Sequence, residues 1–101
     1  MAYENLVAMH VVDASGYARY REHVTPLLHE FGGDFRHDFE ISGVLRSDVK
    51  HPVTRLFVIR FPDSATCERF FTDPRYLAGR REFFVPSVAA YTVIAAFDRE
   101  T

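Results

Sequence analysis

Two stretches of this chain follow the same plan, an apolar strand that runs directly into a helix capped by aspartate. The first stretch, LVAMHVVDAS, begins at Leu6, and the second, LFVIRFPDSA, begins at Leu56. When the two are aligned, Asp13 coincides with Asp63. Aspartate is among the residues that best cap a helix N-terminus. The two junctions therefore predict two similar strand–helix halves, related by an approximate twofold symmetry.

The residues around these junctions predict the remaining elements. A stripe of apolar residues at steps of three and four predicts an amphipathic helix that ends at Gly32 and Gly33. Pro26 lies inside this stripe and removes a backbone hydrogen bond, so a kink or break is expected near Thr25. The other predicted elements are strands at residues 6–12, 35–45, 55–61 and 91–97, a helix capped by Asp63 or Ser64, and a short helix from Pro74 to Pro86.

This order, β-α-β-β-α-β with an additional short helix before the last strand, is typical of the ferredoxin-like arrangement. The predicted fold class is therefore α+β, with an antiparallel sheet and both main helices on one face. The first and third strands are expected at the centre of that sheet. A length of 101 residues fits one domain over residues 1–101, with a single modest core.

Net charge and composition limit the kinds of molecule that this chain is expected to bind and the environment in which it is expected to fold. The formal net charge is −2, which favours neither nucleic acid nor an anionic membrane. The apolar stretch near the start contains His10 and ends at Asp13, so neither a signal peptide nor a membrane span is predicted. Cys67 is the only cysteine and cannot form an internal disulfide, which fits a reducing, cytoplasmic environment. Its apolar surroundings favour a packing role.

Alternation along the central strands predicts two apolar faces. One set of side chains is bulky and is expected beneath the helices: Val7, Met9, Val11, Phe57, Ile59 and Phe61. The opposite set is also mostly apolar: Leu6, Ala8, His10, Val12, Leu56, Val58 and Arg60. Because soluble monomers rarely expose such a continuous apolar surface, we expect a second copy to cover it in a twofold homodimer.

Arg60 and His10 coincide in the aligned junctions and are expected to be neighbours on that covered face. A buried arginine needs acceptors for its five N–H groups. One interpretation is a structural ion pair across the dimer with Asp38 or Glu40. The other is a cation that lines a cavity between the two sheets and binds an anionic or carbonyl-bearing ligand.

Further residues are candidates for this predicted site. In the second strand Phe35, Phe39 and Ile41 share one side with His37, which is expected to face the cavity. Tyr76 and Arg81 are candidates for the cavity mouth, although the arginines near them also suit a solvated helix face. His10 is a candidate general base, since a cation and apolar walls favour neutral imidazole; it also suits a hydrogen-bonded core histidine.

Motifs for metal binding, covalent catalysis or cofactor binding are weak or absent in this sequence. The five histidines follow none of the common metal-ligand spacings, and one cysteine excludes the usual structural zinc sets. A haem or metal role for His10 or His37 is therefore the least favoured hypothesis. The sequence contains no nucleophile elbow, no phosphate-binding glycine loop and no cofactor fingerprint, so no cofactor and no metal are predicted.

Two longer segments resemble the family known as domain of unknown function 1330 (DUF1330). These segments are VVDASGYARYREHVTPLLHEFGGDF and LFVIRFPDSATCERFFTDPRY, and the resemblance extends from about Leu6 to Phe97. It implies a ferredoxin-like subunit that pairs into a dimeric α/β barrel, with no established activity for most members. The chain departs from the family by carrying Asp34 after the glycine pair. The arginine that the family places after Tyr76 is here either Arg80 or Arg81.

These observations favour a small cytoplasmic homodimer that binds a small organic molecule between its sheets. Two alternatives stay open. One is a cofactor-independent monooxygenase or isomerase, with His10 as base and Arg60 stabilising negative charge. The other is a non-catalytic, stress-associated dimeric module in which the polar residues only stabilise the dimer.

Overall fold

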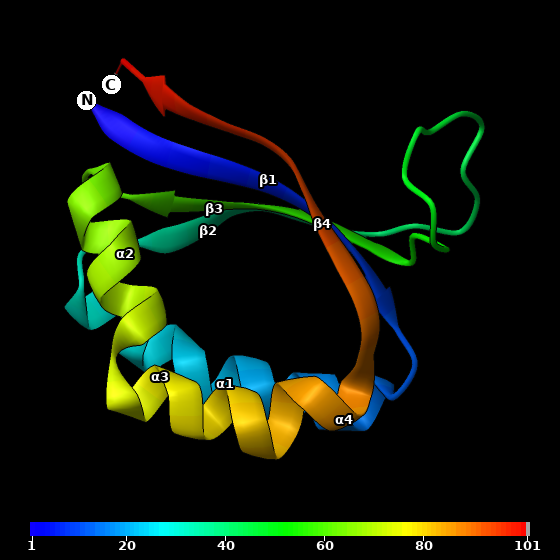
Figure 1. Ribbon diagram of the computed structural model, residues 1–101, viewed down its shortest axis with the longest axis horizontal. Helices are drawn as coiled ribbons and strands as arrows, with labels where there is room; N and C mark the ends of the chain where they lie inside the picture. The colour runs from blue at the N-terminus through cyan, green and yellow to red at the C-terminus, as the bar shows by residue number, and fades with distance from the viewer. Residues whose placement is uncertain (101) are drawn as a thin grey trace.

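The computed structural model describes residues 1–100 as an open antiparallel sheet with helices on one face (Figure 1). The strands are β1 (Ala2–Val11), β2 (Asp34–Glu40), β3 (Arg55–Phe61) and β4 (Val88–Arg99), in the spatial order β2-β3-β1-β4. The helical segments are α1 (Ala14–Glu30), α2 (Ser64–Thr72), α3 (Pro74–Gly79), the π-helical turn η1 (Arg80–Phe84) and α4 (Val85–Ser87). The predicted ferredoxin-like α+β fold is confirmed.

Aspartates begin the three longer helices, as predicted. The Asp13 carboxylate accepts a hydrogen bond of 3.1 Å from the Gly16 N–H at the start of α1. Asp63 accepts one of 2.7 Å from the Thr66 N–H in α2. Asp73 accepts one of 2.8 Å from the Arg75 N–H in α3, which has Pro74 at its first position. Each carboxylate satisfies a backbone donor that the helix itself leaves unpaired.

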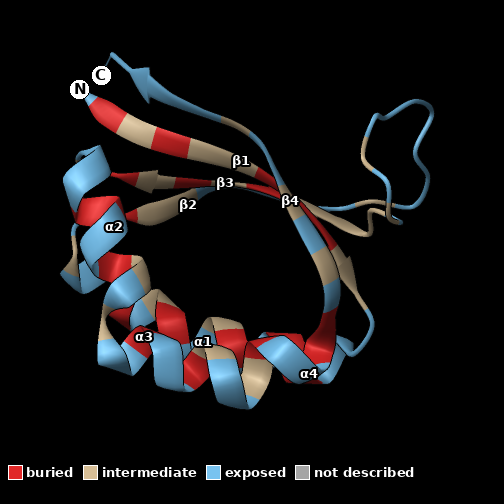
Figure 2. Cartoon of the chain, in the orientation of Figure 1, coloured by how far each residue is buried: buried red, intermediate tan, exposed pale blue. Residues whose placement is uncertain are grey.

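The core lies between the sheet and the helices. The bulky residues predicted for this position are buried there: Val7, Met9, Phe57, Ile59 and Phe61, with Val11 packed against them. Figure 2 shows buried segments where the strands and helices face one another. The Tyr17 and Phe70 rings, from α1 and α2, complete this layer at 1% exposure each. Apolar burial of this kind is the main favourable contribution to the fold.

Several element boundaries differ from the predicted ones. Helix α1 continues through Pro26 without a break, and that proline lies on its exposed side. The helical segment before the last strand continues past Pro86 to Ser87. Strands β1 and β4 are longer than predicted because their polar ends still pair with each other, from Ala2 with Arg99 onwards. Strand β2 ends at Glu40 and does not reach the predicted end at residue 45. No helix within residues 1–100 is both long and apolar enough to cross a membrane.

The predicted alternation of β2 is wrong, because the register between β2 and β3 shifts after Phe35. Phe35 pairs with Ile59 and packs against the core. His37 pairs with Val58, which places it on the opposite side of the sheet. The extra residue, Arg36, forms a β-bulge, and such an insertion reverses the side on which all later residues of a strand lie.

The face of the sheet that carries no helix is called the open face below. Its central part is apolar and half-buried within the single chain: Leu6, Leu56 and Val58, around the fully buried Ala8. Phe39 of β2 and Phe97 of β4 share this face by their pairing with Leu56 and Glu4, and they are 52% and 41% exposed. The predicted second apolar face is therefore present.

Candidate functional site

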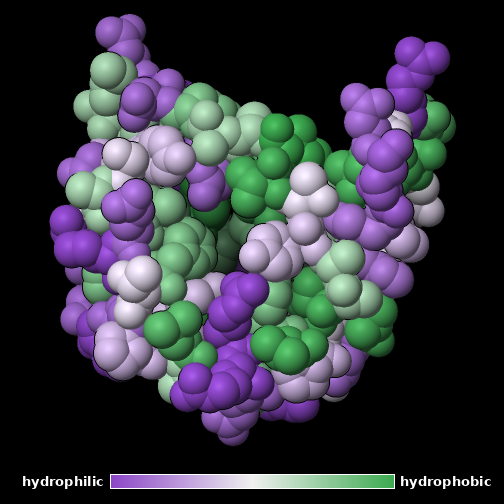
Figure 3. All heavy atoms as spheres, in the orientation of Figure 1, coloured by the Kyte–Doolittle hydropathy of each residue, from purple (hydrophilic) through white to green (hydrophobic). Residues whose placement is uncertain are grey.

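A cavity of about 310 Å³ lies between the helix-covered side of the sheet and the helices. Figure 3 shows a hollow there, with hydrophobic residues around it. Aromatic rings form most of its wall. The helices contribute Tyr17, Tyr20, Phe70, Phe71, Tyr76 and Phe84, and the strands contribute Phe35, Phe57 and Tyr91. A mostly apolar cavity of this size, with few polar groups, is typical of small-molecule sites.

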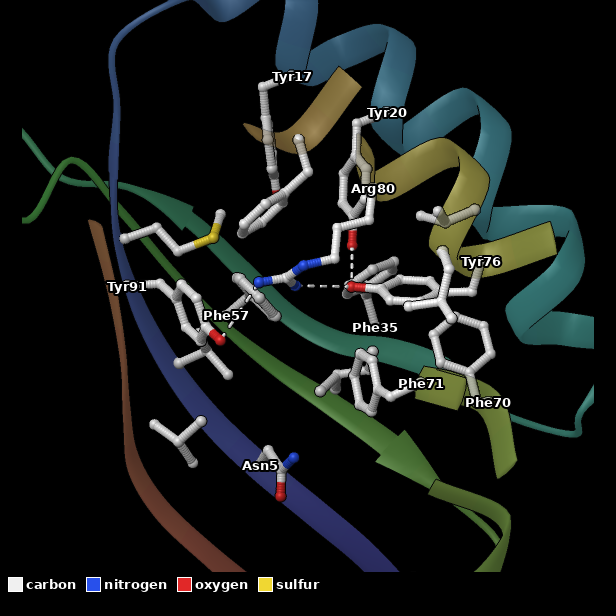
Figure 4. A pocket seen from close by; sticks show the side chains of 17 residues that line it. Asn5, Tyr17, Tyr20, Phe35, Phe57, Phe70, Phe71, Tyr76, Arg80 and Tyr91 are labelled. Atoms are coloured by element: carbon white, nitrogen blue, oxygen red, sulfur yellow. Dashed lines mark hydrogen bonds between the residues drawn. The ribbon is translucent and has the colours of Figure 1, made fainter. Parts of the chain in front are cut away.

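Among residues 1–100, Arg80 is the only charged side chain that lines this cavity. It comes from the π-helical turn η1, and π-turns occur frequently at functional sites. Its guanidinium donates hydrogen bonds to the hydroxyls of Tyr76, at 3.3 Å, and Tyr91, at 3.4 Å (Figure 4). The same group lies 4.6 Å from the Phe84 ring centroid, within cation–π range. Helix and edge strand together therefore hold one cation in an aromatic surrounding.

The tyrosine hydroxyls extend this polar group into the cavity wall. The hydroxyls of Tyr20 and Tyr76 share a hydrogen bond of 3.0 Å, and both residues are buried. Burial, with the nearby Tyr76, raises the pKa of Tyr20 well above its ordinary value. Burial also raises the pKa of Tyr17. These two phenols are therefore protonated at neutral pH, and the Tyr17 hydroxyl accepts a hydrogen bond of 2.7 Å from Arg21 Nε.

The polar group around Arg80 has more donors than acceptors. Arginine has five N–H donors and no acceptor, and each protonated tyrosine adds one donor. Within residues 1–100, no carboxylate oxygen lies within 4.0 Å of the Arg80 nitrogens, and no lining residue is acidic. Arg80 therefore has a positive charge that the described part of the chain leaves uncompensated.

Asn5, on β1, is a second polar residue of the cavity wall. Its amide nitrogen contacts the sulfur of Cys67 at 4.0 Å. Its Oδ1 atom is buried and has no hydrogen-bond partner within the described chain. Burial raises the pKa of the Cys67 thiol to about 11, so the thiol stays protonated and unreactive at neutral pH.

The predicted site residues divide between the two sides of the sheet. Tyr76 lines the cavity beneath the helices, whereas Arg81 is exposed and does not. His10, His37 and Arg60 lie on the open face, by their pairing with Ala90, Val58 and Glu4. The structure therefore places only Tyr76 of this set at the cavity.

The predicted contact between His10 and Arg60 is wrong. Strands β1 and β3 are antiparallel, so Arg60 pairs with Glu4. Glu4 and His10 are six residues apart along β1, a separation of about 20 Å in a strand. The aligned junctions coincide in sequence but lie at opposite ends of the sheet.

Arg60 already has a hydrogen-bond acceptor and a carboxylate partner within its own chain. It donates a hydrogen bond of 3.3 Å to the Gly32 carbonyl oxygen, and it lies 3.9 Å from the Asp34 carboxylate. Asp38, its predicted partner across the dimer, instead binds Arg21 and Arg55 at 3.1 and 2.7 Å on the helix-covered side. The β2 bulge accounts for this difference, because it moves Asp38 to that side.

Sequence reasoning missed Asn5 and Arg80 as lining residues. Tyr76, Arg80 and Phe84 are spaced four residues apart, which predicts a shared helix face and was the available signal. Asn5 lies between Glu4 and the apolar stretch that begins at Leu6, and nothing in the sequence relates it to the helices. Within residues 1–100, no group of three or more metal-ligating side chains comes together.

A family model described as a domain of unknown function (DUF1330) matches residues 5–83. No curated protein matches the chain. Among solved structures, a protein of unknown function from Rhodopseudomonas palustris is similar, with a TM-score of 0.77 and 16% identity over 99% of this chain and 83% of that one.

Two further solved structures share the fold. Hydroxynitrile lyase from Passiflora edulis has a TM-score of 0.67 and 17% identity, over 99% of this chain and 95% of the lyase. A dimeric protein of unknown function with a ferredoxin-like fold, from Bacteroides fragilis, has a TM-score of 0.64 and 8% identity, over 97% of this chain and 96% of that one. At these identities the similarity establishes the fold alone.

Proposed function

This chain belongs to the DUF1330 family, and we propose that it binds a small organic molecule in the cavity between its sheet and its helices. The molecule carries a carboxylate or a carbonyl group, which accepts hydrogen bonds from Arg80. The observation that supports this proposal is the isolated positive charge of Arg80 in an aromatic cavity without acidic residues.

The surrounding of Arg80 favours an anionic group for a physical reason. A charge-assisted hydrogen bond is stronger than a neutral one, and the planar guanidinium matches the two oxygens of a carboxylate. Tyr76 and Tyr91 hold the guanidinium in place through their hydroxyl oxygens, and the remaining N–H groups of Arg80 are available as donors. A bound carboxylate would satisfy these donors and neutralise the charge.

Binding is a better-supported function than proton-transfer catalysis. The residues that line the cavity include no histidine, aspartate or glutamate to act as a base at neutral pH. His10, the predicted base, lies on the other side of the sheet from the cavity. An oxygenase or isomerase that used His10 with Arg60 would also need these two residues close together, and the register of β1 and β3 separates them.

The open face supports a second part of the proposal, a homodimer in which two sheets pack face to face. Its apolar residues continue from Phe39 on β2 to Phe97 on β4. A second copy would bury this surface through a twofold, self-complementary contact. The similar protein from Bacteroides fragilis is described as dimeric. His10, His37 and Arg60 would then border the dimer interface.

The ligand proposal is tested by titration calorimetry with benzoate as the probe. Arg80→Met removes the cation and keeps a flexible apolar side chain. A hydrogen bond to a charged group contributes about 1.5–3 kcal/mol, so the affinity should fall roughly 10- to 100-fold. Arg81→Met is the matched control, because Arg81 is adjacent and exposed; it should bind benzoate like the unmodified protein. Equal affinity of both variants would contradict the proposal.

A further inference from the structure

The cavity has two polar ends, Arg80 and Asn5, and both lie on the helix-covered side of the sheet. Asn5 and Met9 both line it from β1, and Met9 pairs with Tyr91, which binds Arg80. Four residues along a strand span about 13 Å, so Asn5 lies roughly that far from the strand position nearest Arg80. Figure 4 shows Asn5 and Arg80 well apart, with apolar side chains between them.

The Asn5 amide is incompletely satisfied within its own chain. Buried polar groups in folded proteins nearly always have a hydrogen-bond partner, and one without a partner costs free energy. The Oδ1 atom of Asn5 has none, and the contact of its Nδ2 atom with Cys67 is weak at 4.0 Å. Asn5 lines the cavity, so a rotation of its amide would bring the unpaired oxygen within reach of a ligand that supplies the missing bond.

The wall between these two ends selects the shape of the ligand. Phe57, Phe71 and Tyr20 present ring faces and edges, which attract other aromatic rings in stacked or perpendicular geometry. A volume of about 310 Å³ is at the lower end of small-molecule sites. A planar molecule with a single ring fits these conditions best.

We infer that the ligand is a hydroxy-substituted aromatic carboxylate, with its carboxylate at Arg80 and its hydroxyl group at Asn5. This inference rests on the proposed function and specifies its ligand. The hydroxyl group both donates and accepts hydrogen bonds, so it satisfies the Asn5 amide whichever way the amide is oriented. The aromatic ring occupies the apolar wall between the two polar ends.

The experiment compares benzoate with 4-hydroxybenzoate by calorimetry, using the full chain and an Asn5→Leu variant. A neutral hydrogen bond contributes about 0.5–1.5 kcal/mol, so 4-hydroxybenzoate should bind the unmodified protein roughly 2- to 10-fold more tightly. In N5L the two affinities should become equal. The ligand-free melting temperature of N5L should stay the same or rise, because the substitution removes a buried polar group without a partner.

The outcomes separate this inference from the proposed function. If both compounds bind equally well to the unmodified protein and both lose affinity in R80M, the hydroxyl assignment is wrong and the anion site remains. If N5L keeps the preference for 4-hydroxybenzoate, the hydroxyl group does not contact Asn5 and the inference also fails. If neither compound binds, or if R80M binds both as well as the unmodified protein does, the proposed function itself fails.

Discussion

Arg80 and Arg81 are adjacent in the sequence, yet their surroundings differ completely. The Arg80 side chain is half-buried, donates hydrogen bonds to two tyrosines and makes a cation–π contact with Phe84. Arg81, by contrast, is exposed. Successive residues on a helical segment point in directions about 100° apart, so only one of two adjacent arginines can face the cavity. Arg81 was predicted for the cavity mouth, whereas the four-residue spacing from Tyr76 favours Arg80, which lines the cavity.

Asp38 is the residue for which pH dependence is most clearly expected. Burial alone would raise its pKa, but hydrogen bonds and charges from Arg55 and Arg21 outweigh burial, and the pKa lies below its ordinary value of 3.8. A carboxyl group whose pKa is lower in the folded state stabilises the fold above its unfolded-state pKa. That stabilisation is lost as the pH falls through the folded-state pKa.

We therefore expect the free energy of unfolding to fall as the pH decreases below about 4, partly through Asp38. Asp38→Asn should be less stable than the unmodified protein at pH 7 and should lose less stability over the acid range. Urea denaturation at a series of pH values measures both effects. Parallel pH profiles for the two proteins would show that Asp38 contributes nothing to acid sensitivity.

At the scale of elements, local signals predicted the type of each element and the central position of β1 and β3, but not the register between strands. The aspartate caps and the period of α1 depend on residues close in sequence, so they could be identified directly. The β2 bulge at Arg36 depends on how β2 pairs with β3, which local alternation does not encode. For the same reason β1 and β4 were predicted too short and β2 too long, and the separation of His10 from Arg60 by the antiparallel register was missed.

The turn between α1 and β2 is a further element whose geometry is tightly constrained. Gly32 has a φ of 78°, a conformation that favours glycine. A Cβ atom on Gly33 would lie 2.5 Å from the backbone oxygen of Arg60 and 2.7 Å from a methyl carbon of Leu28. Because a backbone atom cannot move aside easily, the turn requires the absence of a side chain at this position.

Gly33→Ala should therefore lower the free energy of unfolding by about 1–3 kcal/mol, the usual range for overpacking. Gly43→Ala is the matched control, since no atom lies within 4 Å of a Cβ placed there. Urea denaturation of both variants measures the difference. A G33A protein as stable as G43A would mean that the turn relaxes without cost.

At the scale of the whole molecule, the sheet separates two surfaces with different proposed roles. The helix-covered side encloses the aromatic cavity, and the open face is the proposed dimer contact. The second apolar face could be predicted from alternation in the central strands alone. The cavity could not, because it is formed by residues from eight elements whose relative positions depend on the complete fold.

Charge introduced on the open face should prevent association. Phe39 is 52% exposed in the single chain, so Phe39→Glu should leave the subunit folded while placing an unpaired charge in the proposed interface. Sedimentation velocity at micromolar concentration should show a dimer for the unmodified protein and a monomer for this variant. Val85→Glu changes a residue of α4 that is 62% exposed and should remain dimeric. Dimers of equal stability in both variants would place the interface elsewhere.

The most direct test of the account is a crystal structure of the protein with 4-hydroxybenzoate. We expect the aromatic ring in the cavity between sheet and helices, with a carboxylate oxygen within hydrogen-bond distance of the Arg80 guanidinium. A molecule bound on the open face beside His10 or Arg60, with the cavity empty, would contradict the assignment of Arg80 as the cation that holds the ligand.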